Sequence, residues 1–360
     1  MRLAARGVVQ RPAFAAIVIL TLAVGIGANS AVFSVVSGVL LQPLPFKTPN
    51  QLVGIRETLP DEASDPLAYR TYAEFRDRNR LLDSIAATAS WNFNVQFGDS
   101  GARVPGMRVT ASYFTVMGLN PVLGRGFQAD EQQPGAEPVA IIDSDRWQRY
   151  FGGTLDVLTR RITLDLVRYR IVGVMPDLPE LKDTGWAGLW TPLYKDDQKE
   201  RLNPGRYLNV IGRLKPNVSV EQSQAELARI MSLLRRDFPE THGKQYGVLV
   251  RSLAGFVVPE GTRAALLILL GVVGFVLLIA CSNVANLMLA RGASREREVA
   301  VRAALGASRG RLVAQLLIEG SLLSMIAAAL GLLLADAGVD LLVALKPDGV
   351  PLLDNVRISG

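Results

Sequence analysis

Two long stretches without a charged side chain constrain this sequence more than any other feature. No Asp, Glu, Lys or Arg occurs at the 35 positions 12–46 or at the 27 positions 264–290. A third apolar stretch follows Arg311 and is interrupted by Glu319 and then by Asp336. Because a helix of about 20 apolar residues crosses a bilayer, the sequence predicts a membrane protein with three helical spans.

The first stretch has a second interpretation as a cleaved signal peptide, since Arg2, Arg6 and Arg11 precede it. Its apolar run extends over residues 12–41. The apolar core of a signal peptide has only about 7–15 residues. We therefore favour a span that is retained in the mature protein.

The net charge of +6 resides in two short segments beside the predicted spans. Residues 1–12 carry +3 and residues 291–311 carry +4, which leaves −1 for the rest of the chain. Lys and Arg are enriched on the cytoplasmic side of membrane proteins. We therefore place these two segments in the cytoplasm and the large segment between the first two spans outside. The same distribution argues against a nucleic-acid partner, which needs a basic face.

The segment between the first two spans combines short strands, short helices and many Gly and Pro turns, which is typical of an α+β domain. Ser219 and Gln222 form the sequence pattern of a capping box, and Ser64-Asp65-Pro66 is a helix-start signal. Residues 162–166 and 169–174 are predicted to pair as strands. The predicted fold class is thus a membrane protein with α-helical spans and an α+β extracytoplasmic domain of two subdomains, the second inserted in the middle.

The predicted order of segments covers the whole chain. It consists of a cytoplasmic N-terminus (1–11), a first span (12–41), the extracytoplasmic domain (42–260), a second span (261–290), a cytoplasmic coupling segment (291–311), a third span that extends outside (312–345) and an extracytoplasmic tail (346–360).

Groups that carry enzyme chemistry are scarce. His242 is the one histidine and Cys281 the one cysteine, so ordinary zinc sites and histidine-based triads are excluded. We expect His242 in an exposed turn and Cys281 inside the second span. The acidic pairs Asp143/Asp145 and Asp196/Asp197 are interpreted as surface charge. No G-x-x-x-x-G-K-[ST] motif for ATP occurs. We predict a non-catalytic protein without metal or cofactor of its own.

Two features of the spans are candidates for function. Ala23, Gly27 and Ala31 recur every four residues, a spacing that lets helices pack closely in lipid; alternatively, they reflect the small residues common in spans. Glu319 lies inside the third span. It is either a charge at the cytoplasmic interface or a group that couples motion.

The cytoplasmic segment is predicted to contain a short helix. Ser294 is a suitable N-cap, Glu296 lies in the first turn, Glu298 and Arg302 form an i,i+4 pair, and Gly306 ends the helix. A second helix is expected to begin near Ser308 and to continue into the third span.

Four groups of residues resemble a known family. They are the run from Arg11 to Ser34 with its exit at residues 42–46, the run from Asn283 to Arg309 with residues 315–319, the pattern Tyr113-Phe114…Gly124-Arg125, and residues 172–176. Together they resemble the MacB/FtsX-like permeases of ABC transporters, with a MacB-type periplasmic core domain. The most similar branch is the acidobacterial duplicated orphan permease.

The resemblance implies partners and a mechanism. A separate ABC ATPase binds ATP and contacts the short cytoplasmic helix, and the first two spans carry its motion to the periplasmic domain. The residues that match this coupling helix are Ser294, Arg295, Glu296, Arg297, Glu298, Arg302, Gly306, Ser308 and Arg309. The resemblance also implies an inner-membrane location, a second permease unit (a homodimer or a duplicated half) and a periplasmic adaptor or outer-membrane factor.

The family has four spans in each unit, so we interpret this chain as truncated before the fourth. The leading hypothesis for its function is export, with a permease driven by an ATPase in trans. The alternative is an FtsX-like signalling or scaffold protein that regulates a periplasmic partner without moving a substrate.

Overall fold

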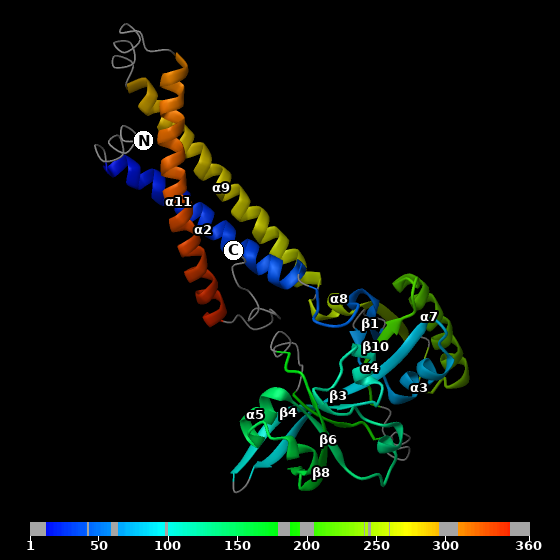
Figure 1. The fold of residues 1–360 in the computed structure, drawn as a ribbon. Helices are drawn as coiled ribbons and strands as arrows, with labels where there is room; N and C mark the ends of the chain where they lie inside the picture. The colour runs from blue at the N-terminus through cyan, green and yellow to red at the C-terminus, as the bar shows by residue number, and fades with distance from the viewer. Residues whose placement is uncertain are drawn as a thin grey trace. The chain divides into compact units, whose positions relative to one another are not determined.

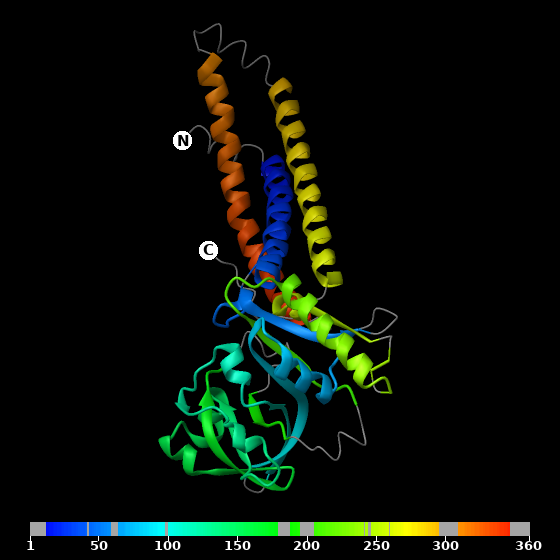
Figure 2. The same cartoon turned by 90° about the vertical axis from the view of Figure 1, so that its right-hand side faces the viewer.

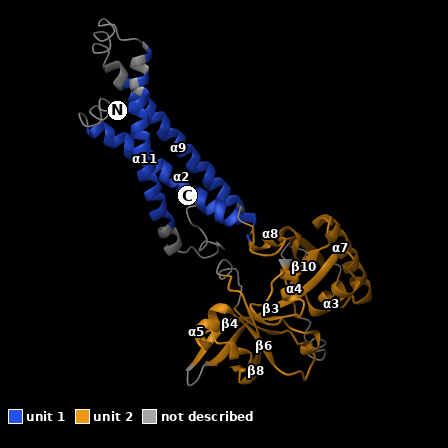
Figure 3. Cartoon of the chain, in the orientation of Figure 1, with its two compact units in different colours: residues 1–42, 258–360 blue, residues 43–257 orange. Residues whose placement is uncertain are grey.

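The computed structural model describes residues 12–41, 43–58, 64–97, 100–178, 188–194, 205–240, 242–243, 246–258, 260–294 and 309–345. The chain divides into two compact units, coloured separately in Figure 3. Unit 1 contains residues 1–42 and 258–360, and unit 2 contains residues 43–257.

The described residues of unit 1 form a bundle of three helices. They are α2 (Pro12–Val36), which continues into the π-helical turn η1 (Ser37–Leu41), α9 (Glu260–Ser294) and α11 (Arg309–Leu345). Each contains a segment long and apolar enough to cross a membrane: Pro12–Leu40, Glu260–Ala290 and Leu317–Val339. Helix α2 contacts both of the others and lies between them in Figure 2, where α2 is blue, α11 orange and α9 yellow.

The first part of unit 2 is a four-stranded α/β subdomain. Its elements follow the order βαββαβ: β1 (Leu52–Thr58), α3 (Tyr69–Arg78), β3 (Leu82–Phe97), β10 (Asn209–Leu214), α7 (Val220–Asp237) and β11 (Gly247–Ser252). The strands are antiparallel in the spatial order β11-β1-β10-β3 (Figure 1). A short additional strand of two residues, β2 (Ser64–Asp65), pairs with β1.

The second part is a barrel subdomain inserted between β3 and β10. Its strands are β4 (Ser100–Val109), β6 (Val139–Asp143), β7 (Arg161–Leu164), β8 (Val167–Met175) and β9 (Leu189–Pro192). Their pairings run β3-β4-β9-β6-β8-β7 and return to β3, so six strands form a closed ring. The shorter elements are β5 (Leu123–Gly124), α4 (Tyr113–Met117), α5 (Ser144–Phe151), η2 (Pro49–Gln51), η3 (Ala129–Gln132), η4 (Leu155–Thr159) and α8 (Leu253–Val257).

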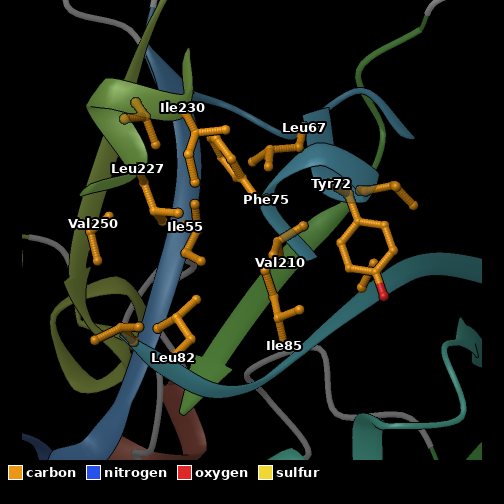
Figure 4. Packing of buried hydrophobic residues seen from close by; sticks show 14 of the residues in the cluster. Ile55, Leu67, Tyr72, Phe75, Leu82, Ile85, Val210, Leu227, Ile230 and Val250 are labelled. Atoms are coloured by element: carbon orange, nitrogen blue, oxygen red, sulfur yellow. The ribbon is translucent and has the colours of Figure 1, made fainter. Parts of the chain in front are cut away.

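Each subdomain has its own hydrophobic core. In the α/β subdomain, Phe75 of α3 and Leu227 and Ile230 of α7 pack on Ile55 and Val210 of the sheet (Figure 4). The barrel core contains Phe93, Ile142, Leu164, Ile171 and Leu189, one from each of five strands. The predicted α+β domain with a second subdomain inserted in the middle is therefore confirmed.

Local capping signals in unit 2 account for several helix ends. Ser219 and Gln222 form the reciprocal capping box at the start of α7, with distances of 3.2 and 2.9 Å between their side-chain oxygens and the partner's amide nitrogen. Gly118 and Gly152 end α4 and α5 in the left-handed conformation.

One helix-start prediction is wrong. Ser64 and Asp65 do not begin a helix; they form β2 and pair with β1, and α3 begins at Tyr69. The pairing with Glu57 and Thr58 prevails over the local signal, because it satisfies the backbone groups of Ser64 and Asp65 themselves.

Candidate functional site

The chain segments that join the spans to unit 2 meet on two neighbouring strands. Ten residues, 42–51, separate the end of η1 from β1, and seven residues, 253–259, separate β11 from α9. Strands β1 and β11 are antiparallel partners, and the first pair in their register joins Val53 to Ser252. The segment that follows η1 and the segment that precedes α9 therefore adjoin one hydrogen-bonded strand pair.

Glycine allows the second of these segments to pack on β1. A Cβ at Gly54 would collide with the ring of Phe256 in α8, so this ring lies directly against the strand backbone. The Arg56 guanidinium lies 5.6 Å from the centre of the same ring. Helix α8, which leads to α9, is thus held against β1.

Arg213 of β10 holds the segment that follows the first span. Its Nε donates to the Val116 carbonyl at 2.8 Å, and its Nη1 donates to Thr48 Oγ1 at 2.6 Å. Thr48 has a left-handed backbone (φ 45°), a conformation that is costly for a β-branched residue. Desolvation lowers the pKa of Arg213.

A buried polar network lies between β1 and α3. Glu57 is fully buried and accepts hydrogen bonds from Thr71 Oγ1 and Arg206 Nε, each at 2.5 Å. Thr71 Oγ1 also lies 2.9 Å from Nε2 of His242. Because the Thr71 hydroxyl donates its one proton to Glu57, Nε2 of His242 is the donor to Thr71. The Arg206 guanidinium lies 3.9 Å from the centre of the Tyr246 ring.

The prediction that His242 is exposed is wrong, since only 1% of the residue is accessible. Its backbone nitrogen donates to the Phe238 carbonyl at 2.9 Å, which folds the segment after α7 back onto the subdomain. Burial lowers the pKa of His242 below its ordinary value; Glu57 and Glu240 act against this shift, and Arg206 and Arg70 act with it.

We expect the unfolding free energy of unit 2 to decrease as the pH falls below about 6.5. Because the folded-state pKa of His242 is lower than the unfolded-state pKa, the stabilisation is complete above pH 6.5 and is lost as the pH approaches the folded-state value. Pulse proteolysis of the full chain at pH 7.5 and 5.5 measures this change. The unfolding free energy of the His242→Gln variant should change less between pH 7.5 and 5.5, a range in which ordinary carboxylates do not titrate. The same pH dependence in both proteins would contradict this interpretation.

In unit 1, small residues bring α2 and α11 into backbone contact. A Cβ at Gly27 would lie 2.9 Å from the carbonyl oxygen of Gly331, and a Cβ at Gly331 would lie 3.0 Å from the carbonyl oxygen of Ala23. A Cβ at Gly338 would lie 3.8 Å from the Cβ of Ala31. The structure therefore places Ala23, Gly27 and Ala31 along the α2–α11 contact, with both alanines buried.

Glu319 is buried in the same bundle and is only 2% accessible. It precedes by one helical turn Leu323, which packs with Ala15 and Val18 of α2. At Gly27 and Ala31, each residue of α2 lies next to a residue of α11 whose number is higher by 304 to 308. The same offset places Glu319 at the level of residues 12–15, in the first turn of α2.

The predicted coupling helix falls almost entirely outside the described residues. Arg295, Glu296, Arg297, Glu298, Arg302, Gly306 and Ser308 belong to this group. Ser294 is the last residue of α9, and Arg309 is the first of α11. The expected helix start near Ser308 thus agrees with the start of α11.

The interpretation of Asp143 as surface charge is wrong, whereas that of its neighbour Asp145 agrees with the structure. Asp143 is buried, and its carboxylate caps α5 by accepting from the Arg146 backbone nitrogen at 2.7 Å and from Arg146 Nη1 at 2.6 Å. Burial raises the pKa of Asp143. Asp145 pairs with Arg149 on the surface, and Asp196 and Asp197 lie outside the described residues. Within the described part of the chain, no three His, Cys, Asp or Glu side chains are placed to hold a metal ion.

Sequence reasoning missed the polar network and the contacts of Arg213. One signal was available: Val53, Ile55 and Glu57 alternate along β1, and this period places the Glu57 side chain on the buried face. The partners of Glu57 and Arg213 come from distant parts of the chain, which a single sequence does not bring together.

Two protein families match the chain. The MacB-like periplasmic core domain matches residues 15–230, and the FtsX-like permease C-terminal domain matches residues 270–353. The macrolide export ATP-binding/permease protein MacB of Salmonella paratyphi A is 24% identical over 283 residues, which are 76% of this chain and 42% of that protein. MacB of Escherichia coli K12 is 26% identical over 256 residues, 70% of this chain and 38% of that protein. The chain thus spans less than half the length of these relatives.

Solved structures were matched with lower similarity. The periplasmic region of MacB from Actinobacillus actinomycetemcomitans has a TM-score of 0.44 and 14% identity, with coverage of 62% of this chain and 93% of that one. The extracellular domain of the noncanonical ABC-type transporter YknZ from Gram-positive bacteria has a TM-score of 0.40 and 13% identity, with coverage of 55% and 99%.

Proposed function

Because this chain belongs to the family of ABC-transporter permeases with a MacB-like periplasmic core domain, we propose that it is the permease subunit of a MacB-type exporter. In this proposal a separate ABC ATPase hydrolyses ATP in the cytoplasm, and the permease transmits the resulting motion through its spans to unit 2. A second permease unit and a periplasmic adaptor or outer-membrane factor complete the assembly. The location is the inner membrane, with unit 2 in the periplasm.

One observation carries the mechanical part of the proposal. The segments from the first and second spans enter unit 2 on the paired strands β1 and β11. Strand β1 also pairs with β10, whose Arg213 holds Thr48. A displacement of α2 against α9 therefore acts on one strand pair through segments of ten and seven residues. Short, fixed connections transmit displacement, whereas long flexible ones absorb it.

The cytoplasmic part of the proposal rests on the sequence. In this proposal residues 294–307 contact the ATPase, with Arg295, Glu296, Glu298 and Arg302 on the polar face of the coupling helix. Glu319 is buried and lies one helical turn before Leu323, which packs on α2, and in this proposal it takes part in coupling the motion of α11 to that of α2. An ionisable group buried in a membrane bundle is costly and is often functional.

An insertion in the first connecting segment tests this proposal. Four residues, Gly-Ser-Gly-Ser, are inserted between Lys47 and Thr48 of the chain in complex with its ATPase. We expect ATP hydrolysis to continue, while the ATP-dependent change in hydrogen exchange of the β1 and β11 amides is lost.

The matched control carries the same insertion after Gly135, an exposed turn where nothing lies within 4 Å of a Cβ. This control should behave as the parent protein does. An ATP-dependent change that survives the Lys47 insertion would contradict transmission through β1.

A further inference from the structure

We propose that one end of the barrel subdomain is a docking surface for an extracytoplasmic protein that presents an apolar socket lined by carboxylates. The surface, called here the Leu166 patch, consists of Trp91, Arg103, Arg108, Leu166, Val167 and Arg168. It stands independently of the proposed transport function, because it uses no contact of the membrane helices.

The first observation is an exposed leucine in an unfavourable backbone conformation. Leu166 is 93% accessible, the highest value among the exposed large hydrophobic residues described. It forms the β7–β8 turn with Asp165, and both have positive φ, 68° and 49°. Such turns favour Asn-Gly or Asp-Gly, and a leucine in this region is a genuine outlier. Strained residues of this kind concentrate at functional sites.

The second observation is that the turn is held rigidly. Asp165 Oδ1 accepts from the backbone nitrogen and from Nδ2 of Asn94, both at 2.9 Å, and Oδ2 accepts from Trp91 Nε1 at 2.9 Å. The Asp165 backbone nitrogen donates to the Asn94 carbonyl at 3.0 Å. Burial acts to raise the pKa of Asp165, but these hydrogen bonds, together with the nearby charge of Arg108, lower it overall. Leu166 is therefore presented in a fixed position rather than on a mobile loop.

The third observation is positive charge around the apolar side chains. The Arg108 guanidinium lies 3.8 Å from the centre of the Trp91 ring. Arg103 lies opposite Asn94 in the β3–β4 register, and Arg168 lies two residues after Leu166. Within the described part of the chain, none of these three arginines forms a salt bridge. The Asp165 oxygens are already occupied by Trp91 and Asn94.

These properties favour a protein partner. Trp and Arg are enriched among the residues that dominate binding energy at protein interfaces, and an aromatic or aliphatic anchor in a pocket is a common centre for such an interface. The partly exposed Val167 and Trp91 extend the apolar area around Leu166. The exposed Arg103 and Arg168 favour negative charge at the rim of the socket, whereas the charge of Arg108 is partly balanced by Asp165 within the patch. A membrane surface, in contrast, recognises mobile basic and apolar side chains and does not need a leucine fixed at one angle.

Photo-cross-linking in cells tests the proposal on the full chain. The probe is p-benzoylphenylalanine in place of Leu166, with the same residue in place of Leu155 as the matched control. Leu155 is 75% accessible and lies in η4 of the same subdomain, outside the patch. We expect one protein adduct from position 166, with an acidic cross-linked segment identified by mass spectrometry, and none from position 155. The double variant Arg103→Glu/Arg168→Glu should lower the yield at least about tenfold, since like charges then face each other.

A second variant separates binding from folding. Leu166→Gly relieves the positive-φ strain, so local opening of the β7–β8 hairpin should become about tenfold rarer. Hydrogen exchange of the β7 and β8 amides measures the frequency of this opening. For cross-linking of the Leu166→Gly variant, p-benzoylphenylalanine replaces Val167. Loss of the adduct together with slower exchange supports the proposal. Four outcomes would each overturn it. They are an adduct with phospholipid or with a second copy of this chain, equal yields at positions 155 and 166, no adduct at all, and a yield that charge reversal does not change.

Discussion

Replacing Glu57 by alanine is expected to destabilise unit 2 by about 3–5 kcal/mol. Glu57 is fully buried, and its two oxygens accept hydrogen bonds from Thr71 and from Arg206, whose side chain is itself mostly buried. Removing the carboxylate leaves the Arg206 guanidinium without its counter-charge in a site of low polarity. Pulse proteolysis of the full chain across a urea gradient gives the change in unfolding free energy.

Glu240→Ala is the matched control for this substitution, because Glu240 is exposed and lies close in sequence to His242. A surface change of this kind should alter the unfolding free energy by no more than about 0.5 kcal/mol. If Glu57→Ala cost as little as the control, the network would not stabilise the subdomain.

Replacing Gly27 by isoleucine is expected to separate α2 from α11. The new Cβ would lie 2.9 Å from the Gly331 carbonyl oxygen and 3.1 Å from the Leu334 Cβ, and backbone atoms cannot yield as a flexible side chain can. The readout is a disulfide between Ala31→Cys and Gly338→Cys in a Cys281→Ser background. The site suits a disulfide because the two Cβ atoms would be 3.8 Å apart.

We expect rapid oxidation of this pair in the parent protein and at least a tenfold slower reaction in the Gly27→Ile variant (a factor of ten corresponds to about 1.4 kcal/mol). Gly274→Ile in α9 is the matched control, because nothing lies within 4 Å of a Cβ there. Equal oxidation rates in the two glycine variants would show that close packing at Gly27 does not hold the helices together.

The sequence contains strong signals for elements that depend on local chemistry. Uncharged runs reveal helices that are long and apolar enough to span a membrane, because charge is costly in lipid. The capping box at Ser219 and the left-handed glycines at 118 and 152 identify helix ends, because each satisfies backbone groups within a few residues. These predictions need no knowledge of distant contacts.

The closed ring of strands has no such local signal. It depends on pairings such as β3 with β7 and β4 with β9, which join residues 67–83 positions apart in the sequence. The alternation of Ile162, Leu164 and Leu166 suggests a strand that continues to residue 166. In the structure the strand ends at Leu164. The Asp165 carboxylate accepts hydrogen bonds from Trp91 and Asn94, and Asp165 forms the turn that follows.

The buried network shows why the neighbours of a residue in the sequence do not always predict whether it is buried. His242 follows Pro239 and Glu240, a polar context that indicates an exposed turn. It is buried because its side chain forms a hydrogen bond with Thr71 and its backbone nitrogen donates to the Phe238 carbonyl. Glu319 is the opposite case: its cost in an apolar span is evident from the sequence, and the structure places it among the buried residues of the bundle.

The central claim is that unit 2 lies outside the cytoplasm while the segment between the second and third spans lies inside. Single cysteines at Leu155 and at Ser294, each in the Cys281→Ser background, test it with a membrane-impermeant maleimide on cells with a permeabilised outer envelope. The account predicts that Leu155→Cys is labelled in intact cells and that Ser294→Cys is labelled only after lysis. Labelling of Ser294→Cys from outside, or protection of Leu155→Cys until lysis, would contradict it.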